Sequence, residues 1–347
     1  MSFGVRPVSL VDDREEMIDI LNRSFGAGQE KRFDWRHIKN PVGEAWAWFG
    51  FDENKSTVAT VAVYPRRMFV DGKLLVCGQV GGFAVDASHR SLGPAILLQR
   101  TTFEPVHSGA VAFCYDCPPH DRGMSTFVRL GMRPNCEIFR YALLLRSNEF
   151  LENRVGKSLW TKPLIAAANL FLGIRMPARK LPGLEITELQ GLFGDEFSDL
   201  DRLVPSSGLI RASRAANLLN WRFREYPNVD EEYHILVARK GGELLGFVVL
   251  WMCDQRAYIL DLFGVQLISI GPALLQAAIE VCRRKKSDSL HAYSSDDNEL
   301  RPLLAGAGFR RREREARVVA YEHSNGRADK LLNHGLRWTF SRVEEML

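Results

Sequence analysis

Residues 35–41 read WRHIKNP and residues 221–227 read WRFREYP, so the pattern Trp-Arg-x4-Pro occurs twice, 186 residues apart. Further along the chain, LGPAIL at 92–97 is followed 178 residues later by IGPALL at 270–275. Chance could supply one such similarity, but several in the same order at nearly one offset indicate an internal repeat. The chain is therefore predicted to hold two copies of one fold, with the repeated tryptophans in a structural role.

A third similarity extends the repeat toward the end of each copy. LGM at 130–132 is matched by AGF at 307–309, an offset of 177. The chain has 347 residues, which is the length of about two domains. We therefore divide it into copy one (1–149), a linker (150–182), copy two (183–325) and a C-terminal tail (326–347).

Hydrophobic spacing and turn residues predict the same order of elements in both copies. The expected fold class is α/β (α+β), in which each copy is a mixed, mostly antiparallel twisted sheet flanked by helices. Asp71-Gly72 lies between apolar runs, which is a hairpin signal. In copy one we expect strands at 45–51, 57–64, 68–70, 74–77, 81–85, 110–115 and 138–145, and helices at 11–25, 94–106 and 123–130. In copy two we expect strands at 233–239, 244–251, 257–265, 289–293 and 317–322, and helices at 270–285 and 298–307.

The composition is that of an ordinary globular protein, with 46% hydrophobic and 25% charged residues. A net charge of +4 is too small to indicate a nucleic-acid partner. No run of ~18 apolar residues and no signal peptide is visible, so we expect no transmembrane segment and a cytoplasmic location. The apolar stretch 164–174 of the linker would form a helix of ~17 Å, which leaves only a weak contact with a membrane surface open.

The six cysteines are spread thinly along the chain and do not form a disulfide framework. The one CxxC is Cys114-Tyr-Asp-Cys117, and a zinc site would need a second ligand pair that the sequence lacks. The segment is also predicted to be a strand, where residues three apart point to opposite faces. We therefore expect buried thiols and no metal.

The loop 86–95, DASHRSLGPA, joins a predicted strand to a predicted helix. The start of a helix presents free backbone N–H groups and a favourable dipole to an anion. Gly93 lets the backbone approach a ligand closely, and Arg90 adds a charge-assisted contact. The loop is therefore a candidate phosphate site, and a plain turn is the alternative.

The stretch 83–95, FAVDASHRSLGPA, resembles the coenzyme A loop of the GCN5-related N-acetyltransferase (GNAT) superfamily. The family pattern is Gln/Arg-x-x-Gly-x-Gly/Ala between a strand and a helix, and it is met here by the six residues from Arg90 to Ala95. Leu130-Gly131-Met132 and Gly308-Phe309 resemble the family's Gly-Phe signature. The resemblance covers most of the chain as a tandem pair of GNAT-like domains.

This resemblance implies an acyl-CoA-dependent N-acyltransferase, with acetyl-CoA as the expected co-substrate. It implies that one strand pairs with the pantetheine amides and polarises the thioester carbonyl, and the strand residues are Phe83, Ala84 and Val85. It also implies that the N–H groups of the loop hold the pyrophosphate, and the loop residues are Arg90, Ser91, Leu92, Gly93, Pro94 and Ala95. An amine would then attack the thioester directly.

Copy one departs from the family pattern in its groups for proton transfer. Phe127 stands four residues before Gly131, where many members carry a tyrosine that protonates the leaving thiolate. No carboxylate lies on the strand 81–85, where many members keep a general base, and Pro94 removes one N–H from the loop. The candidate acids and bases therefore come from the next strand and its loop, and they are Tyr115, Asp116, His120 and Asp121.

Copy two departs further, because Ile268 stands where copy one has Arg90. We expect copy two to be a degenerate partner that shapes the acceptor groove, and the acceptor to be a small-molecule or peptide amine. Two other functions stay open at this point. One is an aminoacyl transferase of the cell-wall bridge type, which uses tandem copies of this fold but takes aminoacyl-tRNA. The other is a non-catalytic CoA-binding module.

Overall fold

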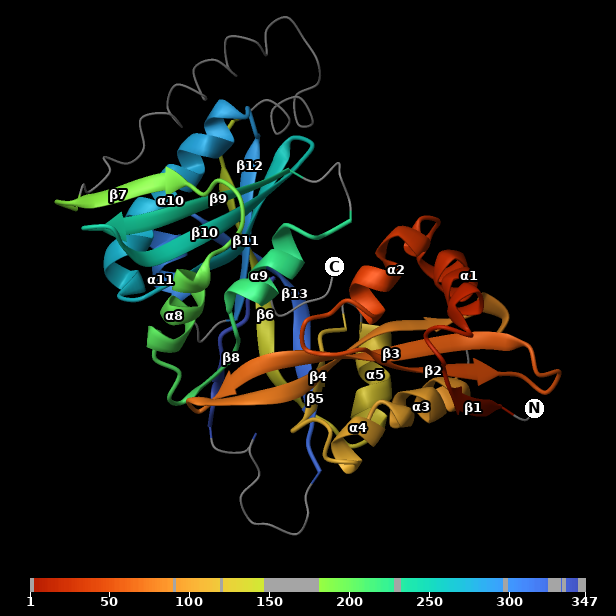
Figure 1. The fold of residues 1–347 in the computed structure, drawn as a ribbon. Coiled ribbons are helices and arrows are strands. Elements are labelled where there is room, and N and C mark those ends of the chain that lie inside the picture. The colour runs from red at the N-terminus through yellow and green to blue at the C-terminus, as the bar shows by residue number, and fades with distance from the viewer. Residues whose placement is uncertain are drawn as a thin grey trace, which may run out of the picture.

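The computed structural model describes residues 3–89, 92–118, 121–146, 181–227, 232–295, 299–323, 332 and 335–342. Figure 1 shows two halves, each a sheet with helices on it, joined by two strands that run between them. Copy one forms the red-to-yellow half and copy two the green-to-blue half.

Copy one follows the predicted order with three differences. The strands predicted at 57–64 and 68–70 form one strand, those predicted at 74–77 and 81–85 form another, and a first strand and a second helix were not predicted. Its strands are β1 (Gly4–Pro7), β2 (Trp46–Phe51), β3 (Thr57–Val70), β4 (Lys73–Val85), β5 (Cys114–Asp116) and β6 (Pro134–Leu144). Its helices are α1 (Arg14–Phe25), α2 (Gln29–His37), α3 (Leu92–Thr101), α4 (Glu104–His107) and α5 (Asp121–Arg129), with a 3-10 turn at Ala87–His89.

Copy two repeats this order and is followed by a short strand from the C-terminal tail. Its strands are β7 (Leu184–Glu188), β8 (Leu209–Ala212), β9 (Glu232–Lys240), β10 (Glu243–Cys253), β11 (Arg256–Gly264), β12 (Ser289–Ser295) and β13 (Arg310–Tyr321), and the tail adds β14 (Arg337–Trp338). Its helices are α8 (Asp195–Leu203), α9 (Ala216–Phe223), α10 (Leu267–Arg284) and α11 (Leu300–Gly306).

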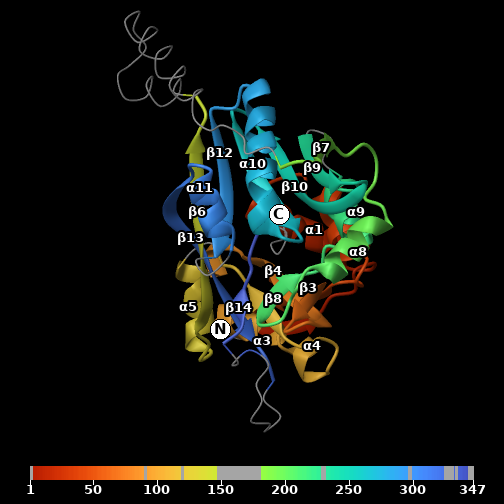
Figure 2. The ribbon, with the colours of Figure 1, turned by 90° about the vertical axis from the view of Figure 1, so that its left-hand side faces the viewer.

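The two copies exchange their last strands. The main sheet runs β1-β2-β3-β4-β5-β13-β6-β12-β11-β10-β9-β7. Strand β6 of copy one therefore pairs with β12 of copy two, and β13 of copy two pairs with β5 of copy one. Figure 2 shows yellow β6 beside blue β12. The two predicted sheets are thus one continuous sheet, and neither copy is complete without a strand from the other.

Helices cover both faces of each half because the strands alternate their apolar side chains. In copy one, Ala47 and Phe49 pack under α1 and α2, whereas Trp48 between them packs under α3 and α4. In copy two, Phe247 and Val249 face α8 and α9, and the alternate residues of β10 face α10 and α11. The core of each half therefore has two layers, one on each side of the sheet.

The predicted hairpin at Asp71-Gly72 is confirmed. Asp71 has φ of 49° and Gly72 has φ of 78°, which are the positive angles of a two-residue hairpin turn. The predicted single helix over 94–106 is wrong, because α3 ends at Thr101 and α4 begins at Glu104. Pro105 lacks the N–H that would bond to the carbonyl of Thr101, so the first helix cannot continue through it.

The repeated tryptophans join the two copies. The rings of Trp35 on α2 and Trp221 on α9 stack at 4.5 Å with 15° between their planes. The indole N–H of Trp35 donates to the carbonyl of Trp221 at 2.8 Å, and that of Trp221 donates to the carbonyl of Trp35 at 3.1 Å. This reciprocal contact confirms the structural role predicted from the repeat.

Candidate active site

An opening between two parallel strands defines the candidate site of copy one. Strands β4 and β5 pair only at Gly78 with Cys114 and at Gln79 with Tyr115. Past Gln79, β4 continues to Val85, and β3 is its only neighbouring strand among the described residues. Two parallel strands that separate in this way leave one strand edge without a neighbouring strand, where an extended ligand with amide groups can add its own hydrogen bonds.

A β-bulge lies on the edge of this opening. The register between β3 and β4 shifts between Thr60 and Ala62, and Gly82 in the bulge has φ of 61°. A Cβ at Gly82 would lie 3.2 Å from the hydroxyl oxygen of Tyr64. Both the backbone angle and the close approach therefore require glycine here. Bulges re-aim backbone groups, so the predicted thioester-binding residues Phe83, Ala84 and Val85 follow directly on a locally redirected segment.

The predicted phosphate loop connects β4 to α3. Gly93 is exposed in the first turn of α3, and no described atom outside its own helical turn lies within 4 Å of a Cβ built on it. Pro94 follows in the same turn, where its missing N–H breaks no helical hydrogen bond. Arg90 and Ser91 lie outside the described residues, as do the side chains of Leu92 and Pro94. The described residues thus supply the strand before the loop and the exposed first turn of the helix after it.

The candidate acids and bases have different environments. Tyr115 is 1% exposed, and its ring lies 5.7 Å from that of Trp338 of the tail. Asp116 ends β5, and its Oδ1 accepts a hydrogen bond from the N–H of Cys117 at 2.7 Å. His120 lies outside the described residues, and Asp121 pairs with Arg317 of β13. Tyr115 and Asp116 are thus at the opening, Tyr115 as a core residue and Asp116 as a turn residue.

Phe127 also belongs to the core. It is 3% exposed on α5 and packs with Met124 and Val319, the latter on the exchanged strand β13. The residue that replaces the family's tyrosine therefore fastens α5 to the strand contributed by copy two.

A row of three polar residues lies at the last paired position before the opening, and sequence reasoning identified only one of them, Tyr115. Tyr64 of β3 is directly opposite Gln79 of β4, and Gln79 is beside Tyr115 of β5, so the three side chains share one face. Gln79 is 4% exposed, and its Oε1 has no hydrogen-bond partner among the described residues. The hydroxyl of Tyr64 lies 3.0 Å from Nε2 of His37. Only the strand register reveals this row, because its members are far apart in the sequence.

His37 is held neutral in this row. Burial lowers the pKa of His37 to about 3, with the nearby Arg36 as a second cause. Its Nδ1 lies 3.0 Å from the carbonyl of Phe33, so Nδ1 carries the proton and Nε2 accepts from the hydroxyl of Tyr64. Burial also raises the pKa of Tyr64. The pair is therefore a fixed neutral hydrogen-bond chain beside the bulge.

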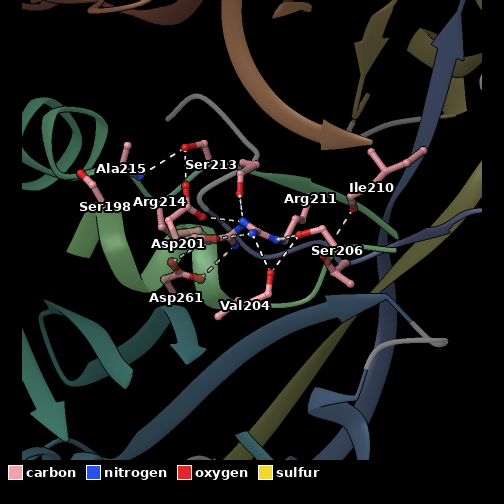
Figure 3. Close-up of polar contacts among 12 residues, drawn as sticks. Ser198, Asp201, Val204, Ser206, Ile210, Arg211, Ser213, Arg214, Ala215 and Asp261 are labelled. Atoms are coloured by element: carbon pink, nitrogen blue, oxygen red, sulfur yellow. Dashed lines mark hydrogen bonds and ion pairs between the residues drawn. The ribbon is translucent and has the colours of Figure 1, made fainter. Parts of the chain in front are cut away.

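Copy two has a carboxylate on the strand that corresponds to β4. Asp261 of β11 lies 178 residues after Phe83, the offset of the repeated loop. Arg214 binds both oxygens of Asp261, at 3.1 and 3.2 Å, and the hydroxyl of Ser341 donates to it at 3.2 Å. Figure 3 shows Asp261 and Arg214 within this buried polar cluster. The carboxylate is a structural anchor, because its oxygens are already engaged.

A second buried ion pair completes the cluster of Figure 3. Arg211 donates to Asp201 at 2.5 Å, and the hydroxyl of Ser213 donates to the other oxygen of Asp201 at 2.5 Å. Both side chains of the ion pair are 3% exposed. Buried charges of this kind persist when they are fully hydrogen-bonded, so the cluster fixes α8 against β8.

The stretch of copy two that corresponds to the phosphate loop of copy one is part of a helix. Helix α10 begins at Leu267, soon after β11 ends at Gly264, and Ile268 is 70% exposed in its first turn. Gly271 lies inside the helix, where a Cβ would approach the side chain of Leu303 to 3.0 Å. This glycine serves close helix packing, whereas Gly93 of copy one faces open space.

Comparisons with known proteins agree with this architecture. The family model described as "Acetyltransferase (GNAT) domain" matches residues 5–120, and the model "Acetyltransferase (GNAT) family" matches residues 201–309. The chain is therefore a tandem member of the GNAT superfamily. By sequence alone, no curated protein matches it.

Solved structures share the fold at low sequence identity. A conserved protein of Enterococcus faecalis V583, described as a probable N-acyltransferase, has a TM-score of 0.66 at 12% identity, covering 92% of this chain and 72% of its own. A GCN5-related N-acetyltransferase of Anabaena variabilis has a TM-score of 0.63 at 13% identity, with coverages of 92% and 72%. The N-myristoyltransferase of Saccharomyces cerevisiae, solved with myristoyl-CoA, has a TM-score of 0.57 at 12% identity, with coverages of 92% and 82%.

The described part of the chain lacks two further features. No group of three or more His, Cys, Asp or Glu residues there could hold a metal ion. None of the helices described there is both long and apolar enough to cross a membrane. Cys114 and Cys117 pack into different core clusters on opposite faces, as the strand prediction requires.

Proposed function

We propose that the protein is an acyl-CoA-dependent N-acyltransferase whose acyl-CoA site lies in copy one, and that the acyl group is acetyl. The observation that carries the proposal is the contrast between the copies. Both copies open a parallel strand pair beside a bulge, but in copy one the bulge contains Gly82 with φ of 61°, and the first turn of the following helix contains the exposed Gly93. In copy two, Gly271 corresponds to Gly93 and packs against Leu303. Asp261, the carboxylate at the position of Phe83, is bound by Arg214.

The residues of copy one fit the parts of acyl-CoA. The edge of Phe83–Val85 offers backbone groups to the pantetheine amides, and the first turn of α3 with Arg90 offers N–H groups and charge to the pyrophosphate. A backbone N–H next to the bulge polarises the thioester carbonyl, and the charge that develops on that oxygen is stabilised there. Acyl-CoA supplies the activated acyl group.

Proton transfer relies on positioning more than on one strong acid or base. The attacking amine nitrogen forms a bond to the acyl carbon, the C–S bond breaks, and the thiolate takes a proton. Water carries the amine proton to Asp116, His120 or bulk solvent, and solvent or Tyr115 protonates the thiolate. Gln79, whose Oε1 has no hydrogen-bond partner in the described part of the chain, accepts a hydrogen bond from an N–H group of the acceptor.

The cellular setting and the acceptor class belong to the same proposal. All six cysteines are free thiols, which suits the reducing cytoplasm. The acceptor is a small-molecule or peptide amine.

Turnover of acetyl-CoA with a panel of amines, followed as free thiol, tests the proposal. The wild type should release thiol only when an amine acceptor is present. Gly93→Asp should bind no CoA, because its side chain would enter the space open to phosphate and its charge would repel the ligand. Arg90→Ala should weaken binding by ~1–3 kcal/mol. Thermal unfolding of both variants controls for folding.

Two outcomes would replace this proposal. CoA binding without turnover of any amine would identify a binding module. Transfer from aminoacyl-tRNA without CoA binding would identify the aminoacyl transferase class.

A further inference from the structure

A single side chain from β3 covers the bulge of β4. The ring of Tyr64 lies over two neighbouring glycines, because a Cβ built on Gly81 would lie 3.1 Å from its Cε2 and one built on Gly82 would lie 3.2 Å from its hydroxyl oxygen. Tyr64 is 1% exposed, so its ring cannot move away from the bulge without repacking the core. The place of this ring therefore decides where the backbone of the bulge lies.

His37 of α2 fixes the place of the Tyr64 ring. The hydroxyl of Tyr64 donates to Nε2 of His37 at 3.0 Å, and Phe33 in turn holds the imidazole. The ring of Phe33 stacks on the imidazole at 4.4 Å with 23° between the planes, and the carbonyl of Phe33 accepts from Nδ1 at 3.0 Å. Both ring nitrogens of His37 are thus engaged, and the residue is 0% exposed. The histidine, the tyrosine and the bulge form one connected unit.

Copy two forms the same elements with other side chains at these places. In the repeated Trp-Arg motif, Phe223 stands where copy one has His37, and it is 4% exposed in the core of copy two. The bulge of copy two lies on β11 and contains Leu260, which is 2% exposed, where the bulge of copy one contains Gly82. The fold therefore does not require a hydroxyl–imidazole pair over a glycine bulge. The copy that has this pair is the copy with the exposed Gly93.

The segment that follows the bulge is the one that meets the thioester in the proposed function. A backbone N–H next to the bulge polarises the thioester carbonyl, whereas the loop before α3 and the edge of Phe83–Val85 hold the rest of acyl-CoA. A hydrogen bond depends steeply on its direction, and displacing a catalytic group by about 1 Å can cost roughly 10²-fold in rate. Support for the bulge therefore affects the rate of transfer more than the binding of acyl-CoA.

We propose that Tyr64 and His37 are positioning residues, which hold the Gly82 bulge so that the backbone N–H next to it points at the thioester carbonyl. This proposal rests on the proposed function of copy one. The pair touches neither the acyl group nor the amine, and the hydroxyl proton stays between Tyr64 and His37 throughout the reaction. Its effect is on kcat, because the contacts that bind CoA lie elsewhere.

Steady-state kinetics of the full chain test the proposal, with acetyl-CoA and the amine of the panel that releases most thiol. Tyr64→Phe removes the hydroxyl but keeps the ring, and His37→Phe places the residue of copy two in copy one. Each should lower kcat about tenfold and change the KM for acetyl-CoA, and the Kd of CoA by calorimetry, less than about twofold. His37→Gln keeps a hydrogen-bond acceptor for the hydroxyl, so its kcat should exceed that of His37→Phe at least about threefold. Rates are taken per folded chain, from circular dichroism, so that a loss of stability changes none of these values.

A further variant tests the contact between the hydroxyl and the bulge. Gly82→Ala places a methyl group 3.2 Å from the hydroxyl oxygen of Tyr64 and strains a backbone with φ of 61°. The strain persists in Tyr64→Phe, but the close contact disappears. The loss of kcat caused by Gly82→Ala should therefore be at least about threefold smaller in Tyr64→Phe than in the wild type.

Tyr321→Phe is the matched control. The hydroxyl of Tyr321 also lies beside a histidine, 2.7 Å from Nε2 of His107, but on the face of copy one that α3 and α4 cover. The values of kcat and KM should both stay those of the wild type in this variant.

Hydrogen exchange gives a readout that does not depend on turnover. The backbone amides of residues 80–85 should exchange faster in Tyr64→Phe than in the wild type and in Tyr321→Phe, because the bulge is held less firmly. Thiol release by the wild type tests the proposed function, whereas these comparisons between variants test the pair. Full kcat in folded Tyr64→Phe and His37→Phe would overturn the proposal, as would a fall in kcat with an equally large rise in KM. So would unchanged exchange at 80–85 in Tyr64→Phe.

Discussion

The paired tryptophans offer the sharpest test of how the two copies are held together. Trp35→Phe removes the N–H that the carbonyl of Trp221 accepts at 2.8 Å, and Trp221→Phe removes the reciprocal bond at 3.1 Å. A buried carbonyl without its donor costs about 1–3 kcal/mol. Weakening of the 4.5 Å stack costs about 0.5–1.5 kcal/mol more. Each variant should therefore lose roughly 1.5–4.5 kcal/mol of unfolding free energy.

The double variant decides whether the two residues act as a unit. Each single variant weakens the stack, but the double variant can lose it only once, so the double loss should fall short of the sum by about 0.5–1.5 kcal/mol. Urea unfolding followed by far-UV circular dichroism measures this without relying on tryptophan fluorescence. The wild type should unfold in one transition, because each half needs a strand from the other.

The matched control is Trp48→Phe. Its indole N–H bonds Glu104 of copy one at 3.2 Å, and it does not touch Trp221. Its loss should add to that of Trp221→Phe within about 0.5 kcal/mol. Additive losses for Trp35 and Trp221 as well, or two separate transitions in the wild type, would refute the reasoning.

Two further predictions concern protonation. The pKa of His37 is about 3 in the fold and about 6.5 in the unfolded chain, so its stabilising effect is complete above pH 6.5 and is lost as the pH falls toward 3. Unfolding free energy should drop by about 2 kcal/mol from His37 between pH 7.5 and pH 5, and His37→Gln should remove that part of the slope and leave the part due to His291, whose pKa is about 4; an unchanged slope would contradict the buried neutral state. In catalysis, Tyr115→Phe, Asp116→Asn and His120→Gln should each reduce turnover only partly, since a general acid or base typically contributes ~10²–10⁴-fold. A larger loss in any one of them, with CoA binding intact, would show that a single residue is indispensable.

The repeat made the fold predictable because both copies keep the residues that local structure needs. Asp71-Gly72 forms the predicted hairpin turn, and Gly93 with Pro94 opens the predicted helix. The strand exchange was not predictable, because β6 and β13 would satisfy the same alternation in either copy. The arginine-rich stretch at 310–314 is exposed and, as part of β13, forms cross-strand pairs with β6, in which Arg314 bonds Glu137 at 2.9 Å.

The candidate site was predictable only where it is local in sequence. The loop after β4 is one continuous stretch, so composition and order expose it. The row of Tyr64, Gln79 and Tyr115 depends on the register of three strands, and its neutral His37 comes from a helix that packs above them. Burial and register decide these roles, and no motif carries that information.

The number of acyl-CoA molecules bound per chain tests the central claim most directly. Calorimetric titration of the full chain with acetyl-CoA should give one site, lost in Gly93→Asp and kept in Gly271→Ala if that variant folds, because Gly271 is packed against Leu303 in copy two. Two equivalent sites per chain, or one site that survives Gly93→Asp, would contradict the assignment of the acyl-CoA site to copy one.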